Sequence, residues 1–425
     1  MPEPFDPSKL TRRGFLETAS AAGAVPFIAG LSGASAMPAA SPRIQIEQNM
    51  IGAYGPWAAS LVGDGPARIS FLREQFNDVD AWRKEARARV MDCLAPPDVP
   101  AVADVRVEQT VEYDGLKIEH LSWQLSYGPR TRAVLLKPLN ARGKLPAVIG
   151  LHDHGGRKYF GHEKITRVSD DQHPLMKEHQ DDYYGGRAWA NELARRGYVV
   201  LVHDTFAFAS RKVDMNDVAR GALLNYAPVT DSSLESITTY NAWAGNHEHL
   251  MAKSLFCAGT TWPGVFLTED RRALDYLCSR SDVDPDRVGC AGLSGGGLRT
   301  VYLGGLDERI RCACCVGMMS TWRDYLLHKC HTHTWMIYIP LLPRDLDYPE
   351  IFALRAPAAT LVLNDNEDSL FTLPEMKRAD EMMRAIFDKA GASDRYRCSF
   401  YPGPHKFDVP MQTEAFDWFD RWLTR

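Results

Sequence analysis

Ser294 lies in a five-residue pattern whose glycines are typical of an exposed nucleophile. The segment "GLSGG", residues 292–296, follows an apolar run and precedes a helical pattern that begins "GLRTVYL". A nucleophilic serine must stand on a sharp strand-to-helix turn, where side chains at the flanking glycines would clash. A glycine-rich turn with an idle serine would not need a strand before it and a helix after it. The sequence therefore predicts Ser294 as a nucleophile.

A base and an acid are expected after Ser294 in the chain. A serine hydroxyl is a poor nucleophile until a base takes its proton, and a third group must hold that base. In this arrangement the acid and then the histidine follow the serine, each after a late strand. His405 is the predicted base, because no other histidine follows residues 358–364. Asp368 is the preferred acid, since it lies far enough past that strand to bend back towards His405; Asp365 is the alternative, and Glu367 is a weaker one.

The segment "LHDHGGRKYFGHEK", residues 151–164, permits a metal site as an alternative. It holds three histidines and two carboxylates around its glycines, and "NHEHL" and "HTHTW" add further ligand types. No segment has the H-E-x-x-H spacing that places two histidines on one helical face. The nine cysteines lack paired C-x-x-C segments, so Cys312, Cys314 and Cys315 are predicted to be buried thiols on a strand. We therefore predict no metal ligands.

The elements that must position these residues form a recurring pattern. Six short, nearly continuous apolar runs each lead into a loop, and most lead into a helix. They are residues 146–152, 198–204, 287–294, 310–317, 358–364 and 396–403. Such runs are typical of strands buried on both faces by crossover helices, so a mostly parallel α/β sheet is predicted. The alternating segments 105–125 and 131–138 predict an antiparallel lead-in to that sheet.

Other segments flank this sheet or interrupt it. Residues 44–93 have a helical pattern, with Asn77 or Asp78 as a cap, and the Pro-rich stretch 95–100 ends it. Two spacers, about 206–262 and 317–353, are too long for simple connections and are rich in Trp, Tyr, His and Met. We predict that they are lid-like insertions over a pocket, with plain packing as the alternative.

The N-terminal 36 residues have the order of an export signal. Arg12 and Arg13 precede Phe15 and Leu16, and an uncharged stretch then runs to Ala36. The segment resembles a twin-arginine signal peptide, which implies the Tat export machinery as a partner and a periplasmic or secreted location. A disordered basic N-terminus is the alternative. The stretch is too weakly apolar for a stable membrane anchor.

The net charge of −5, without a long basic run, argues against nucleic-acid binding.

Beyond these features, residues 105–425 resemble a known superfamily. "DVDPDRVGCAGLSGGG", "LVLNDNEDSLF" and "FYPGPHKF" before the last helix are similar to α/β-hydrolases of the dienelactone hydrolase-like and acetyl xylan esterase-like branch. The resemblance implies an α/β-hydrolase domain over 105–425, after a leader at 1–36 and an N-terminal helical segment at 37–104. Dienelactone hydrolases proper have a cysteine nucleophile, so Ser294 favours ester hydrolysis.

The resemblance also gives a role to the segment after residue 150. The oxyanion of a tetrahedral intermediate needs one donor after the nucleophile and another from the loop after an earlier strand. The first donor is the backbone N–H of Gly295. His152-Asp153-His154 matches the family's His-Gly-x turn, which makes the backbone N–H of His154 the second donor. The chain departs from the family at Asp153, where glycine is usual.

The expected function is hydrolysis of carboxylic esters through an acyl-enzyme, without a cofactor. The substrate class is a carbohydrate ester of the acetyl xylan type or a small-molecule ester. A peptidase or amidase with the same triad and a metal-dependent hydrolase are the enzymatic alternatives. A catalytically silent carbohydrate-binding protein is a third, although the three triad residues in order argue against it.

Overall fold

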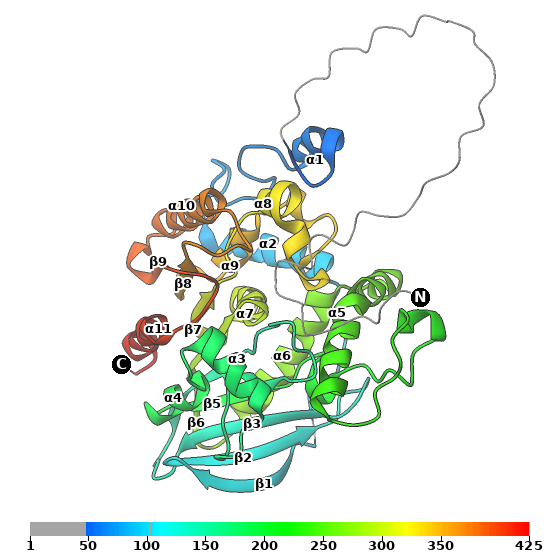
Figure 1. Ribbon diagram of the computed structural model, residues 1–425. Coiled ribbons are helices and arrows are strands. Elements are labelled where there is room, and N and C mark those ends of the chain that lie inside the picture. Colours follow the sequence, from blue (N-terminus) through cyan, green and yellow to red (C-terminus); the bar gives the residue numbers. More distant parts are fainter. Residues whose placement is uncertain (1–47, 103, 425) are drawn as a thin grey trace, which may run out of the picture. The chain divides into compact units, whose positions relative to one another are not determined.

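One nine-stranded sheet forms the centre of the computed structural model, which describes residues 48–102 and 104–424 (Figure 1). The predicted export signal lies outside the described residues. The strands are β1 (Arg106–Tyr113), β2 (Leu116–Trp123), β3 (Thr131–Pro138), β4 (Leu145–Gly150), β5 (Val199–His203), β6 (Val283–Leu293), β7 (Ile310–Val316), β8 (Ala359–Asp365) and β9 (Tyr396–Tyr401). Their order is β1-β2-β3-β5-β4-β6-β7-β8-β9.

The sheet has an antiparallel edge and a parallel centre. β1, β2, β3 and β5 pair antiparallel, whereas β5, β4, β6, β7, β8 and β9 pair parallel. Asp114 and Gly115 join β1 to β2 with φ values of 50° and 75°, and a two-residue hairpin turn needs positive φ at such positions. The predicted antiparallel lead-in and mostly parallel sheet are confirmed.

Helices cover both faces of the sheet. They are α1 (Gly55–Val62), α2 (Val79–Leu94), α3 (Pro174–Tyr184), α4 (Trp189–Arg195), α5 (Leu234–Cys257), α6 (Trp262–Ser279), α7 (Gly295–Leu306), α8 (Trp322–Asp324), α9 (Tyr348–Ala353), α10 (Leu373–Lys389) and α11 (Val409–Leu423). In β4, Ala147 and Ile149 pack in one core with α6 and α7, while Val148 packs in the other with α4 and α11. Successive side chains of a strand point to opposite faces, so each buried strand supplies both cores.

The N-terminal helical segment is shorter than its pattern predicts. Asp78 caps α2 by accepting hydrogen bonds from the backbone N–H groups of Asp80 and Ala81, which confirms one of the two predicted caps. The helical pattern is confirmed at α1 and α2 but is wrong over residues 63–77, which form turns and irregular structure. Gly63, with a φ of 80°, and Pro66 interrupt the helix there.

Both long spacers contain their own elements. The first follows the carboxyl end of β5 and holds α5; the second follows β7 and holds α8, short turns and α9. Cys312, Cys314 and Cys315 on β7 are free and buried, as predicted. Within residues 48–102 and 104–424, none of the helices combines the length and apolar character needed to cross a membrane.

Candidate active site

Ser294 occupies the turn between β6 and α7 in a strained conformation. Its φ of 57° and ψ of −116° are uncommon for any residue with a side chain. The backbone N–H of Ser294 donates to Val316 O at 2.9 Å, which ties the turn to β7. A Cβ atom at Gly292 would lie 2.4 Å from Leu151 O, and one at Gly296 would lie 2.0 Å from the same oxygen. The glycines of the pattern are therefore required by close backbone packing.

His405 and Asp368 form the contact expected of a base and its orienting acid. His405 Nδ1 lies 2.6 Å from Asp368 Oδ2, and Asp368 is buried. His405 Nε2 is buried and has no hydrogen-bond partner among the described residues. In a neutral imidazole whose Nδ1 proton is donated to Asp368, Nε2 carries the lone pair that a base needs.

Asp365, the alternative acid, lies at the end of β8 and has a different partner. Its Oδ2 accepts a hydrogen bond from the backbone N–H of Lys406 at 3.1 Å. Burial raises the pKa of Asp365 to about 7. The structure thus brings Asp368, and not Asp365, into contact with the imidazole, while Asp365 braces the loop that carries His405.

The loop after β4 places a backbone N–H beside the turn of Ser294. A Cβ atom at Gly295 would lie only 2.9 Å from the backbone N of His154, so the two backbone segments are adjacent. Lys164 Nζ donates to Asp153 O and to His154 O, each at 2.8 Å, and its side chain is fully buried. In a trans peptide the C=O and N–H point in opposite directions. Lys164, by holding the Asp153 carbonyl, therefore fixes the direction of the His154 N–H.

Asp153 in the same loop is a buried carboxylate. Its Oδ1 accepts from Tyr184 Oη at 2.5 Å and lies 3.1 Å from His179 Nε2, while Lys164 Nζ lies 4.0 Å from Oδ2. Burial alone would raise the pKa of Asp153, but His179 and Lys164 outweigh that effect and hold the pKa well below its usual range. The carboxylate therefore anchors the loop to α3.

The side chain of His154 binds Glu248 of α5. Gly156 N–H donates to His154 Nδ1 at 3.0 Å, so Nε2 carries the proton and donates to Glu248 Oε1 at 2.6 Å. Lys158 Nζ lies 2.8 Å from the same oxygen. Burial alone would raise the pKa of Glu248, but Lys158 and His154 hold the pKa well below its usual range.

The other oxygen of Glu248 binds the second insertion. Glu248 Oε2 accepts from Thr334 Oγ1 at 2.6 Å and from the backbone N–H of Trp335 at 3.1 Å. One buried carboxylate therefore connects the loop after β4 to both insertions.

Ser294, His405, His154 and Glu248 line one cavity of about 360 Å³. Its wall includes residues from both long insertions, among them Gly245, Thr332, His333 and Thr334. His333 packs between Tyr325 and Phe371, and burial lowers its pKa to about 4. Residues of both spacers thus line the same cavity as Ser294.

Sequence reasoning does not identify Glu248 and Lys164, which hold the loop after β4 in place. Glu248 lies in "NHEHL", whose sequence suggests metal ligands and not a link between loops. Lys164 ends the segment "GHEK", which matches no motif. The remaining histidines of residues 151–164 have protein partners: His152 Nδ1 lies 3.1 Å from Asp153 O, and His162 Nδ1 lies 2.8 Å from Asp204 Oδ1. Among the described residues no group of three His, Cys, Asp or Glu side chains is arranged to hold a metal ion.

Known proteins share this arrangement of sheet and helices. A putative acetyl xylan esterase from Bacteroides fragilis superposes with a TM-score of 0.61 and 17% identity, covering 83% of each chain. A glucuronoyl esterase from Solibacter usitatus gives a TM-score of 0.56 and 15% identity, covering 84% of this chain and 97% of the other. The chain has the α/β-hydrolase fold.

A relative is also found by sequence. The α/β-hydrolase-fold chain is 26% identical over 346 residues to "Putative hydrolase YtaP" of Bacillus subtilis (strain 168), across 81% of this chain and 99% of the relative. No family model matches the chain.

Proposed function

We propose that the protein is a serine hydrolase that cleaves carboxylic esters. The observation that carries this proposal is the convergence of Ser294 on its strained turn and the His405–Asp368 pair on one cavity. The esterases among the structural neighbours and the hydrolase name of the sequence relative favour the same reaction. No cofactor is required for it.

The mechanism follows from the positions of these groups. Ser294 Oγ attacks the ester carbonyl while His405 Nε2 takes the hydroxyl proton, and Asp368 stabilises the imidazolium that forms. The backbone N–H groups of Gly295 and His154 donate to the oxyanion of the tetrahedral intermediate. His405 then gives its proton to the leaving alcohol, and the acyl-enzyme remains. Water, activated by the same imidazole, releases the acid and restores Ser294.

The substrate is a carbohydrate ester or a small-molecule ester of similar size. A cavity of about 360 Å³ falls in the range typical of small-molecule sites. Thr332, His333 and Thr334 on its wall offer polar groups next to the apolar surface of Leu293 and Leu370. This composition suits a short acyl group attached to a polar alcohol such as a sugar.

The test compares two serine variants on a substrate panel. Ser294→Ala abolishes cleavage of 4-nitrophenyl acetate and acetylated xylan, whereas Ser254→Ala, at an exposed serine of α5, leaves it unchanged. A chelator has no effect on either protein. Activity that survives Ser294→Ala, or that a chelator removes, contradicts the proposal, and a preference for anilides or peptides over esters would make the enzyme an amidase.

We also propose that the protein is exported in folded form by the Tat machinery to the periplasm or the medium. The support is the order of residues 1–36, with Arg12 and Arg13 before the uncharged stretch. A fusion of residues 1–36 to a fluorescent reporter reaches the periplasm of a Tat-competent cell. The same fusion with Arg12→Lys and Arg13→Lys stays inside. Export of the lysine variant at the same level would contradict the proposal.

A further inference from the structure

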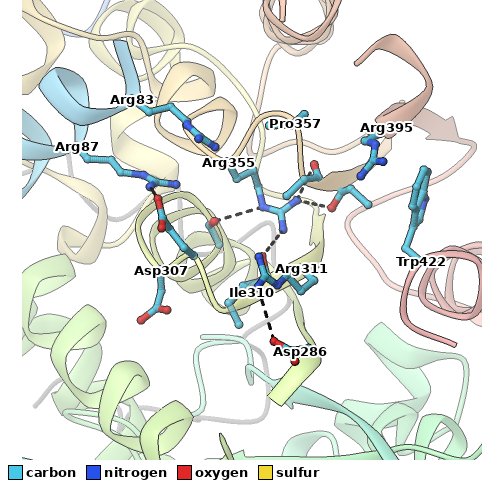
Figure 2. Close-up of a pocket in the computed structure, with 14 residues that line it drawn as sticks. Arg83, Arg87, Asp286, Asp307, Ile310, Arg311, Arg355, Pro357, Arg395 and Trp422 are labelled. Carbon is cyan, nitrogen blue, oxygen red and sulfur yellow. Dashed lines mark hydrogen bonds and ion pairs between the residues drawn. The ribbon is translucent and has the colours of Figure 1, made fainter. Parts of the chain in front are cut away.

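A second cavity lies at the amino ends of the parallel strands, whereas Ser294 lies at their carboxyl ends. Its volume is about 450 Å³, and Ile310 and Ala359, the first residues of β7 and β8, contribute to its wall. Figure 2 shows arginines from α2, β7 and the segments before β8 and β9 around it. Five arginines and three carboxylates line the cavity, which leaves a formal excess of two positive charges.

Arg355 is the buried member of this group. It is 3% exposed, and its guanidinium donates to Gly304 O at 3.3 Å, to Ile310 O at 3.1 Å and to Thr360 Oγ1 at 2.6 Å. Among the described residues no carboxylate lies within 4.0 Å of its nitrogens. A buried charge is normally paired with an opposite one, so Arg355 leaves positive charge uncompensated at this cavity.

The rim of the cavity adds two more guanidinium groups with little compensation. The carboxylate nearest to Arg311 is that of Asp286, at 3.9 Å. Arg395 rests on the ring of Trp422 with its guanidinium carbon 4.9 Å from the ring centroid, and it has no ion pair within the described part of the chain. Both arginines are exposed and can turn towards a ligand.

The remaining carboxylates of the cavity already have cationic partners. Glu308 binds Arg87, and Asp307 Oδ2 lies 2.7 Å from an Arg309 nitrogen. Two lining residues, by contrast, carry buried N–H donors without an acceptor in the described chain: Arg83 Nε and Trp422 Nε1. The cavity therefore keeps positive charge, while Asp307 and Glu308 are paired with arginines.

From these observations we propose that this cavity binds a small molecule bearing a phosphate or sulfate group. A guanidinium presents parallel N–H donors in a planar fork that matches the oxygens of a tetrahedral oxyanion. The volume exceeds that of a bare anion and leaves room for an organic group beside Trp422. The site is separate from the Ser294 cavity and does not depend on the proposed esterase activity.

The proposal is tested by calorimetric titration of the full chain at constant ionic strength. The probes are inorganic phosphate, glucose 6-phosphate and adenosine monophosphate, with glucose as the uncharged control. We expect saturable binding of at least one phosphate probe and none of glucose. Preference for inorganic phosphate would identify a free anion as the ligand, and preference for either ester would identify the organic group that Trp422 contacts.

Charge-reversal variants locate the binding. Arg311→Glu and Arg395→Glu each weaken binding at least about tenfold, because each removes a charge-assisted contact and adds repulsion. Arg220→Glu, at an exposed arginine that follows the carboxyl edge of β5, leaves the affinity unchanged. Circular dichroism confirms that the exposed variants fold. Absence of saturable binding to the wild-type chain, or equal binding by all three variants, overturns the proposal.

Discussion

At the scale of single residues, the two carboxylates near His405 have different hydrogen-bond partners. Asp368 touches the imidazole, whereas Asp365 holds the backbone N–H of Lys406 and leaves its other oxygen buried without a hydrogen-bond partner among the described residues. Asp365 is the last residue of β8, and Asp368 follows three positions later. Their different partners lead to different expectations for the same Asp→Asn change.

Asp368→Asn is expected to lower kcat for an aryl ester by about 10²–10⁴-fold, because the amide favours the wrong imidazole tautomer and cannot stabilise imidazolium. Asp365→Asn is the matched control and is expected to stay within a few-fold of wild type. Steady-state kinetics on purified variants measures both. The reverse order of effects would assign the triad acid to Asp365.

The raised pKa of Asp365 predicts a pH-dependent stability. Its folded-state pKa of about 7 lies above the unfolded value of about 3.9, so the stabilisation is fully present below the unfolded value and is lost as pH rises through 7. Asp365→Asn keeps an oxygen for the Lys406 N–H and removes this loss. Urea unfolding at pH 5 and pH 8 should show the variant gaining on the order of 2 kcal/mol relative to wild type. A pH-independent difference would contradict this account.

Lys164 is expected to act as a positioning residue for the oxyanion donor. Lys164→Gln leaves one carbonyl of the 153–154 segment without its donor, so we expect kcat to fall about 10–100-fold with little change in KM. Lys177→Gln, at an exposed lysine of α3, is the control. Loss of stability with an unchanged kcat would show that Lys164 supports the fold alone.

At the scale of elements, Glu248 connects three segments that are distant in the chain. From its place on α5, it accepts hydrogen bonds from the loop after β4 and from the start of the turn at Trp335–Ile337. One charged carboxylate therefore joins the segments that form this wall of the cavity.

Glu248→Gln is expected to destabilise the protein by about 3 kcal/mol, because it leaves the buried Lys158 ammonium without its counter-charge. The kcat/KM for esters should fall as well, since the amide keeps only one acceptor oxygen, so that either His154 or the Thr334–Trp335 segment loses its acceptor. Glu235→Gln, in the exposed first turn of α5, serves as the control. Chemical unfolding and kinetics of both variants measure these effects, and equal behaviour would contradict the role of Glu248.

At the scale of the whole molecule, sequence patterns predict the parts of the fold that depend on local chemistry. The apolar runs that became β4 to β9, the "GLSGG" turn and the Asp78 cap could each be read from neighbouring residues. The irregular stretch 63–77 between α1 and α2 was not predicted, because the apolar spacing of 69–76 continues although Gly63 and Pro66 have already ended the helix.

The residues of the candidate site could be predicted only where local sequence identifies them. His405 follows a strand and precedes a helix, which is local information. Glu248 contacts Thr334, which is 86 positions away, and Lys164 contacts residues that are 10 and 11 positions away. No spacing rule in the sequence predicts these contacts. Tertiary structure, which brings the carboxyl ends of β4, β6 and β8 to one edge of the sheet, decides those contacts.

The most direct test of the central claim is intact-mass and peptide mass spectrometry after exposure to a fluorophosphonate. The account predicts one adduct per chain, located on Ser294, with loss of esterase activity in proportion to labelling. Lack of an adduct, or an adduct on another residue while esters are still cleaved, would contradict it.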